Sequence, residues 1–288
     1  FALTAANRND EVKLSAAFAK LTDEDPSLQV EQERETHQTV LWGQGEVHLK
    51  VALDRLKQKY NVELQPHAPR TPYRETIRKG THAHGRHKKQ SGGHGQFADV
   101  KLEIRPLGRG EGFQFENKVV GGAVPRQFIP AVEAGAREFL DKGPLGFPVV
   151  DVAVTLNDGQ FHSVDSNELS FKLATAAALK EGLPSCEPVL LEPVLQVTLS
   201  VPTDYTAKVL QLVSGKRGQI LGYEAKDGWR GWDEISAQIP QGEIHDLVVS
   251  LRSLTQGTGF FDWAYDHLQE VPDRLAQAIV GKHGAAAA

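Results

Sequence analysis

The chain gathers basic residues and glycines in one stretch, residues 78–95, which reads RKGTHAHGRHKKQSGGHG. The stretch holds five lysines and arginines and no acidic residue, although the formal net charge of the whole chain is −5. Glycines at positions 92, 93 and 95 would allow backbone amides to approach a phosphate group closely. The pattern indicates a basic loop that grips a phosphate backbone. The alternative is a solvated hairpin loop whose charges face water, and residue types alone do not separate the two.

The same stretch contains four histidines that could suggest a metal site: His82, His84, His87 and His94. A zinc site needs three or four ligands and a hydrogen-bond partner for each imidazole. No cysteine lies near these histidines, and no carboxylate lies between them. We therefore expect no metal and interpret the histidines as polar members of the loop.

A further candidate is His162, within DGQFHSVD at residues 158–165. The segment has the pattern of a strand end, a turn and a helix start, so His162 is expected to be exposed at a loop tip. In a hydrolase, Ser163 would be the nucleophile and Asp165 would orient the histidine. We disfavour this hypothesis because Asp165 is expected to cap the next helix and no oxyanion hole is indicated. A contact between His162 and RNA is favoured, and no catalytic residue is predicted.

Nucleotide-binding motifs are absent from the sequence. No GxxxxGK[ST] sequence occurs: Lys216 is followed by Arg217, and Lys282 by His283. The glycines at 108, 110 and 112 have the wrong spacing for a dinucleotide fingerprint. We therefore do not expect this chain to bind GTP or to act as an enzyme by itself.

Length and composition set the broad class. With 288 residues, 40% apolar and 24% charged, the chain is long enough for two or three domains with ordinary cores. No run approaches the roughly 18–20 apolar residues of a membrane-spanning helix. The acidic balance excludes a uniformly basic nucleic-acid binder, and the single cysteine, Cys186, fits a reducing cytosol. Because the sequence begins at Phe1 without methionine and ends in four alanines, we expect a piece of a longer protein.

The two ends of the chain share one order of elements, strand–helix–strand–strand–helix–strand. In the first, Asn9 is expected to cap the first helix, and residues 62–64 form the closing strand before a proline-rich boundary. QGEVH at 44–48 and QGEIH at 241–245 each open the second helix, with a glutamate in its first turn. The repeat predicts two small split βαβ, or ferredoxin-like, sandwiches.

The middle segment, residues 70–188, follows a different pattern. Strands are expected at 73–78, 97–104, 113–120 and 149–156, and helices at 129–140 and 168–181. Asp165 and Glu168 form a capping-box pattern at the start of the second helix. The predicted buried stripe of that helix consists of Leu169, Leu173, Ala176 and Ala177.

Several motifs, in the same order, resemble the third, fourth and fifth domains of elongation factor G. QGEVHL at 44–49 is similar to the GxGExHL helix start of the family, and YRETI at 73–77 to its YRETI strand. KQSGGHGQF at 89–97 is similar to a loop that usually reads KQSGGRGQ and an aromatic residue. Further similar segments are FHSVDSNE at 161–168 in the fourth domain, and PVLLEP at 188–193 and LRSLTQG at 251–257 in the fifth.

The resemblance implies an α+β fold in which two ferredoxin-like sandwiches, residues 1–69 and 189–281, flank an elongated ribosomal-protein-like βαβ domain, residues 70–188, with a tail at 282–288. It implies that the tip of the middle domain enters the decoding site of the small ribosomal subunit during translocation, and that Lys216 and Arg217 face the large subunit. The implied ribosome-contacting residues are Lys88, Lys89, Gln90, Ser91, Gly92, Gly93, His94, Gly95, Gln96, His162, Lys216 and Arg217.

The implied partners are the ribosome and its rRNA, tRNA, mRNA and a GTPase domain outside this sequence, in the cytoplasm and away from membranes. GTP and Mg²⁺ would bind that other domain, so no cofactor is expected here. The chain departs from the family at His94, where arginine is usual, and at 258–263, where TGFFDW replaces a basic and polar run. These departures are similar to those of divergent elongation factor G-like paralogues. The alternative to translocation is therefore ribosome recycling, or the rescue or protection of stalled ribosomes.

Overall fold

A computed structural model describes residues 1–5, 8–33, 36, 38–90 and 95–287. The described residues form three β-sheets with their helices. The chain divides into two compact units, one of residues 1–72, 199–235 and 241–261, the other of residues 73–198, 236–240 and 262–288. Each sheet is described by itself below. Within the described residues, no helix is long and apolar enough to cross a membrane.

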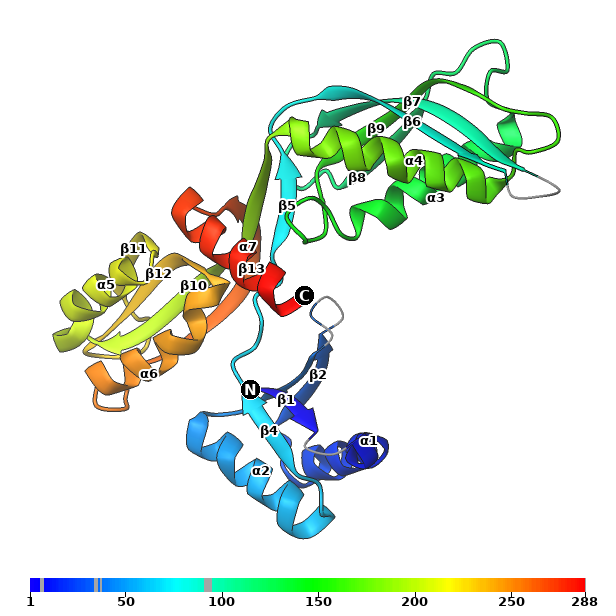
Figure 1. Ribbon diagram of the computed structural model, residues 1–288. Helices are drawn as coiled ribbons and strands as arrows, with labels where there is room; N and C mark the ends of the chain where they lie inside the picture. Colours follow the sequence, from blue (N-terminus) through cyan, green and yellow to red (C-terminus); the bar gives the residue numbers. More distant parts are fainter. Residues whose placement is uncertain (6–7, 34–35, 37, 91–94, 288) are drawn as a thin grey trace. The chain divides into compact units, whose positions relative to one another are not determined.

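The first sheet has the strand order β2-β3-β1-β4, with all of its pairs antiparallel (Figure 1). Two helices pack on it through a core that includes Leu21, Leu41 and Leu56, each fully buried. This is the predicted ferredoxin-like arrangement. The elements are β1 (Ala2–Ala5), α1 (Arg8–Glu24), β2 (Gln29–Glu33), β3 (Gln38–Trp42), α2 (Glu46–Tyr60) and β4 (Leu64–His67).

Two boundaries in this region differ from the prediction. The helix α1 begins at Arg8, so Asn9 lies inside it. The closing strand is β4 rather than residues 62–64, and it includes Pro66. Proline is tolerated there because β4 is an edge strand, where a missing amide costs no ladder hydrogen bond. Val62 is fully buried but precedes the strand.

The last sheet repeats the topology of the first, with the order β11-β12-β10-β13, so the second ferredoxin-like prediction is confirmed. Glu46 begins α2, whereas Glu243 belongs to a short 3₁₀ turn that precedes α6. The terminal helix α7 runs through Ala287, so residues 282–287, predicted as a tail, continue it. The elements are β10 (Pro188–Pro202), α5 (Thr206–Gly215), β11 (Gln219–Ala225), β12 (Trp232–Pro240), α6 (Ile244–Leu254), β13 (Phe260–Glu270) and α7 (Asp273–Ala287).

The middle sheet has the order β6-β7-β9-β8, in which β8 and β9 are parallel and connected through α3 as a βαβ unit. Figure 1 shows α3 and α4 along the same sheet. The strand predicted at 73–78 is confirmed as β5, which pairs with β10 and not with the middle sheet. The elements are β5 (Arg74–Ile77), β6 (Thr81–Lys89), β7 (Gln96–Pro106), β8 (Phe113–Asn117), α3 (Ile129–Leu140), β9 (Val152–Gln160) and α4 (Glu168–Gly182).

Half of the basic stretch is a strand and not a loop, because β6 covers nine of its 18 residues. The side chains alternate: Ala83 and Gly85 are buried toward α4, while His84 and Arg86 are exposed. Gly85 is required by this packing, since a Cβ there would lie 1.9 Å from the carbonyl oxygen of Ala174. The close approach of strand and helix therefore fixes which β6 residues face outward.

The buried side of α4 also differs from the prediction. Its buried residues include Phe171, Ala174, Ala178 and Leu179, whereas the side chain of Leu169 is 53% exposed. The small residues lie against the sheet because only they allow α4 to approach β6 so closely. The predicted stripe of Leu169, Leu173, Ala176 and Ala177 is wrong, because none of these four residues is buried, whereas Phe171 and Leu179 are.

Candidate nucleic-acid interface

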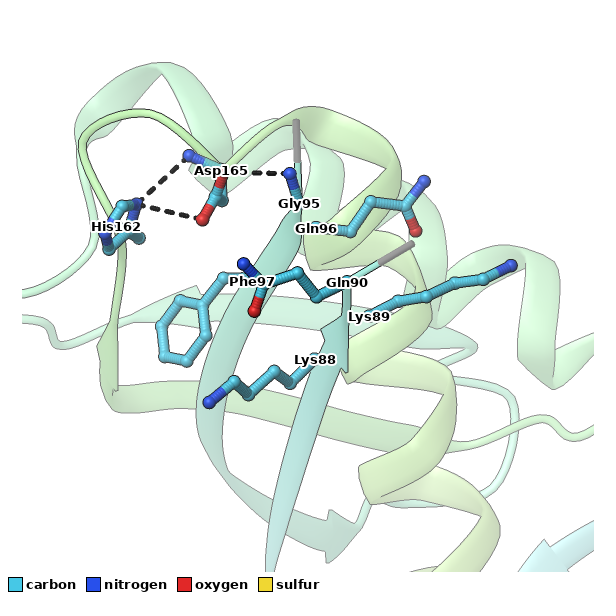
Figure 2. Close-up of a pocket in the computed structure, with 8 residues that line it drawn as sticks. All are labelled: Lys88, Lys89, Gln90, Gly95, Gln96, Phe97, His162 and Asp165. Atoms are coloured by element: carbon cyan, nitrogen blue, oxygen red, sulfur yellow. Dashed lines mark hydrogen bonds and ion pairs between the residues drawn. The ribbon is translucent and has the colours of Figure 1, made fainter. Parts of the chain in front are cut away.

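Lys88 and Lys89 end β6, and strand alternation directs their side chains to opposite faces (Figure 2). Lys88 pairs across the hairpin with Phe97, and Lys89 pairs with Gln96. Lys88, Lys89 and Gln90 are exposed, and Gly95 and Gln96 are half-buried. The predicted residues Ser91, Gly92, Gly93 and His94 lie outside the described residues.

His162 lies in the turn between β9 and α4, and the turn fixes its imidazole. Its Nδ1 accepts the backbone N–H groups of Val164 at 3.3 Å and of Asp165 at 3.2 Å. Asp165 Oδ2 also lies 3.3 Å from this Nδ1, so the two amides and the carboxylate together position the ring. The side chain is 54% exposed, as predicted for a loop tip. The turn therefore holds an exposed imidazole in place at the hollow described below.

The two predicted loops are joined to each other by three hydrogen bonds. The amide of Gly95 donates to Asp165 Oδ1 at 3.0 Å, and the amide of Phe97 donates to the backbone oxygen of Asp165 at 2.9 Å. The hydroxyl of Ser166 donates to the carbonyl oxygen of Phe97 at 2.7 Å. The rings of Phe97 and His162 add an edge-to-face contact, with centroids 6.5 Å apart. Residues 70 positions apart in the sequence thus form one surface.

Asp165 does not have the capping role that was predicted for it. The N-cap of α4 is Asn167, whose side-chain oxygen accepts the amide of Ser170 at 2.8 Å. Asparagine is among the best N-cap residues, so the sequence contained this signal. Asp165 ties the two loops together instead.

These loops surround a hollow of about 290 Å³. Asp165 is the acidic residue in its lining, and one of its oxygens already accepts an amide. Positive charge from the two lysines and donors from His162 and Gln90 suit an anionic ligand. The lining consists of Lys88, Lys89, Gln90, Gly95, Gln96, Phe97, His162 and Asp165 (Figure 2).

Lys216 and Arg217, predicted as a separate contact, follow α5 in the last sheet. Lys216 Nζ lies 3.5 Å from Asp246, and Arg217 Nε lies 3.1 Å from Glu243. Their side chains are only 21% and 32% exposed. A phosphate at this position would compete with internal ion pairs, unlike one at Lys88.

The alternation of the strand places the histidines of β6 on different faces. His82 and His84 are exposed, whereas His87 is half-buried and its Nε2 lies 2.8 Å from Gln96 Oε1. In the part of the chain that the structure describes, no group of three or more histidine, cysteine or acidic side chains is placed to hold a metal ion. His94 lies outside that part, and the prediction that the chain needs no metal stays a prediction.

Phe97 and Arg86 belong to the motif and the basic stretch noted in the sequence, but they were not predicted as contact residues. The Arg86 guanidinium lies over the Phe97 ring, 5.4 Å from its centroid, and Phe97 supports His162. The sequence contained evidence for this contact. Arg86 lies two residues before Lys88, on the same face of the strand, and Phe97 comes two residues after the last glycine of the stretch.

Comparison with known proteins matches nearly the whole chain to one family. Family models match residues 1–68 as elongation factor G domain III, residues 69–187 as domain IV, and residues 189–279 as the elongation factor G C-terminus. An elongation factor G-like protein of Synechocystis is 58% identical over 275 residues, which are 96% of this chain and 41% of that protein.

The fold is similar to a crystal structure of a protein from Thermus thermophilus. The TM-score is 0.88 at 38% identity, over 99% of this chain and 42% of that one. The chain thus spans about two fifths of the length of the proteins it matches. Three successive family domains, a close relative and a shared fold agree, and the chain belongs to the elongation factor G family.

Proposed function

We propose that the chain is the ribosome-binding portion of an elongation factor G-like translational GTPase, which promotes movement of tRNA and mRNA during protein synthesis. One observation carries the proposal: two loops distant in sequence are locked together and present two lysines and the imidazole of His162 at one exposed hollow. Such a surface suits the phosphates and base edges of RNA. The family relationship supports the decoding site, tRNA and mRNA as the RNA in question.

In this proposal the chain's own residues bind and position RNA and do no covalent chemistry. Lys88 and Lys89 attract phosphates, and His162 donates to an acceptor on the RNA. The hydrogen bonds through Asp165 keep the lysines and the histidine at fixed separation, so the tip pushes on RNA as a rigid body. GTP and Mg²⁺ would be bound by a GTPase domain that is not in this sequence, and the proposed location is the cytoplasm.

A divergent role within the family, in recycling or in the rescue or protection of stalled ribosomes, is the second candidate. The observation that favours it is the start of β13, where exposed Phe260 and Trp263 stand in place of the usual basic and polar run. The curated relative from Synechocystis is itself named as an elongation factor G-like protein. Translocation and subunit-splitting assays with the full-length protein separate the two roles.

The proposal is tested by binding of the chain to small ribosomal subunits over a range of salt concentrations. The double variant Lys88→Ala/His162→Ala should bind more weakly, and its log–log salt slope should fall by about 0.7–0.9 because one lysine no longer neutralises a phosphate. The matched control is Lys57→Ala, an exposed lysine of α2, which should leave the slope unchanged. Equal slopes for the double variant and the unmodified chain would refute the RNA-binding tip.

A further inference from the structure

The residues of β6 that face away from α4 form a line of basic side chains leading from the hollow. We name this line the β6 row: His82, His84, Arg86 and Lys88, all exposed. We infer that the β6 row is a second contact for nucleic acid, in which a phosphate backbone follows the outer strand of the sheet beyond the tip. The inference rests on the proposed function, because Lys88 belongs both to the row and to the hollow.

The spacing of the row fits a nucleic-acid strand. Alternate residues of a β-strand lie about 7 Å apart, so the row extends for about 20 Å. Successive phosphates of an extended nucleic-acid strand are separated by a similar distance, which allows each side chain to meet its own phosphate. The strand β6 is at the edge of its sheet, with β7 on one side, so a ligand can approach from the other side.

Of the acidic residues on the same face of the sheet, three have charged partners, whereas Glu103 lies opposite His82 of the row. Asp99, opposite Arg86, is buried and lies 2.8 Å from the Nε2 of His84. Asp158 pairs with Lys101 at 2.8 Å, and Glu116 pairs with Arg105 at 2.7 Å. Lys101 and Arg105 compensate Asp158 and Glu116, so Asp99 and Glu103 are the acidic residues opposite the row, and Arg86 and Lys88 carry its fixed positive charge.

Arg86 is the central residue of the row. It has no ion pair with any residue that the structure describes, and its guanidinium is held over the Phe97 ring. A guanidinium stacked on an aromatic ring keeps its N–H groups free at the edge, where they can donate to a phosphate in two bonds. His82 should contribute less, because Glu103 lies opposite it.

The test compares variants of the row for binding to small ribosomal subunits, again over a salt series. Arg86→Gln should lower the log–log slope by about 0.7–0.9 and raise Kd roughly three- to tenfold. Arg86→Lys should retain most of the slope, since the charge remains. His82→Lys should increase the slope, because it adds a fixed charge at the far end of the row. Lys180→Gln, an exposed position near the end of α4, is the matched control and should have no effect.

The outcomes distinguish this inference from the proposed function. If Arg86→Gln and His82→Lys leave the slope unchanged while Lys88→Ala/His162→Ala lowers it, the β6 row is overturned and the tip remains. If none of these variants alters the slope, the proposed RNA-binding tip fails as well. Thermal unfolding of each variant confirms that the exposed substitutions leave the fold intact.

Discussion

The two faces of β6 contrast sharply although their residues alternate along one strand. Toward α4, Ala83 and Gly85 leave no room for a larger side chain, because the helix backbone lies directly above them. On the other face, His84 and Arg86 extend into solvent with few constraints on their size. The comparison teaches that packing on the inner face determines where the strand lies, whereas the outer face is the one that our proposal assigns to RNA binding. Four predictions test this division, beginning with the largest effect.

The strongest test of the inner face is Gly85→Ala. The new Cβ would lie 1.9 Å from the oxygen of Ala174 and 2.7 Å from the nitrogen of Ala178, so strand or helix must move. We expect a loss of roughly 2–3 kcal/mol in the free energy of unfolding, measured by urea denaturation. Arg86→Ala on the outer face should change the stability by less than about 0.5 kcal/mol. Similar losses for both variants would remove the distinction between the faces.

A second prediction concerns Glu75 on β5, a buried carboxyl that should make the stability depend on pH. Burial raises the pKa of its carboxyl to about 7, although the amides of Leu145 and Phe147 donate to it. The unfolded chain releases this proton near pH 4.5, earlier than the folded chain, so stability should fall as the pH rises from about 4.5 to 7 and then level off. The decrease should be roughly 2–3 kcal/mol.

The matched variant for this prediction is Glu75→Gln, which does not titrate. Its stability at any one pH can differ because an amide replaces a carboxyl beside two N–H donors. The pH-dependent decrease between about 4.5 and 7 should nevertheless disappear. A decrease that persists in the variant would assign the pH dependence to another group.

The variant Asp165→Ala tests whether binding at the hollow depends on the hydrogen bond between Asp165 and Gly95. Asp165→Ala removes the acceptor for the Gly95 amide and should weaken binding to ribosomal subunits roughly three- to tenfold, with a stability loss of about 1 kcal/mol or less. Hydrogen exchange at the Gly95 amide should become faster. Unchanged binding together with faster exchange would show that the loops need not be held together.

The smallest expected effect is the difference between Lys88→Ala and Lys89→Ala. The two lysines are adjacent, and their side chains point to opposite faces. Both line the hollow, but only Lys88 continues into the β6 row. We expect Lys88→Ala to raise Kd at least about twice as much as Lys89→Ala, measured under the same salt conditions. Equal effects would mean that the hollow alone accounts for binding.

The parts of the fold that the sequence predicted are those with regular apolar periodicity. The two ferredoxin-like sheets were identified because their helices and strands place leucines and valines at the expected intervals, as in Leu49 and Leu56. The strand β6 was missed because its inner positions carry alanine, glycine and histidine, which give no apolar alternation. The stripe of α4 was misplaced because apolar residues lie on more than one side of the helix, and the buried set includes Phe171 and Leu179 instead of Leu169 and Leu173.

The candidate site was only partly readable from the sequence. The exposure of His162 followed from its place in a turn, and the basic character of the stretch was plain. The bond between Asp165 and Gly95 could not be predicted, because it depends on how two distant turns meet in three dimensions. The binding roles of the site residues stay predictions until they are measured.

The close approach of Gly85 to the backbone of α4 has an evolutionary consequence. Selection for folding acts on the inner residues of β6, so mutations at the outer residues can alter charge without loss of the native structure. Histidine, lysine or a neutral residue can therefore be exchanged there, and under the proposed function each exchange would change the affinity for RNA in a small step. Paralogues of one translation factor could diverge in this way, along a strand whose own position does not change.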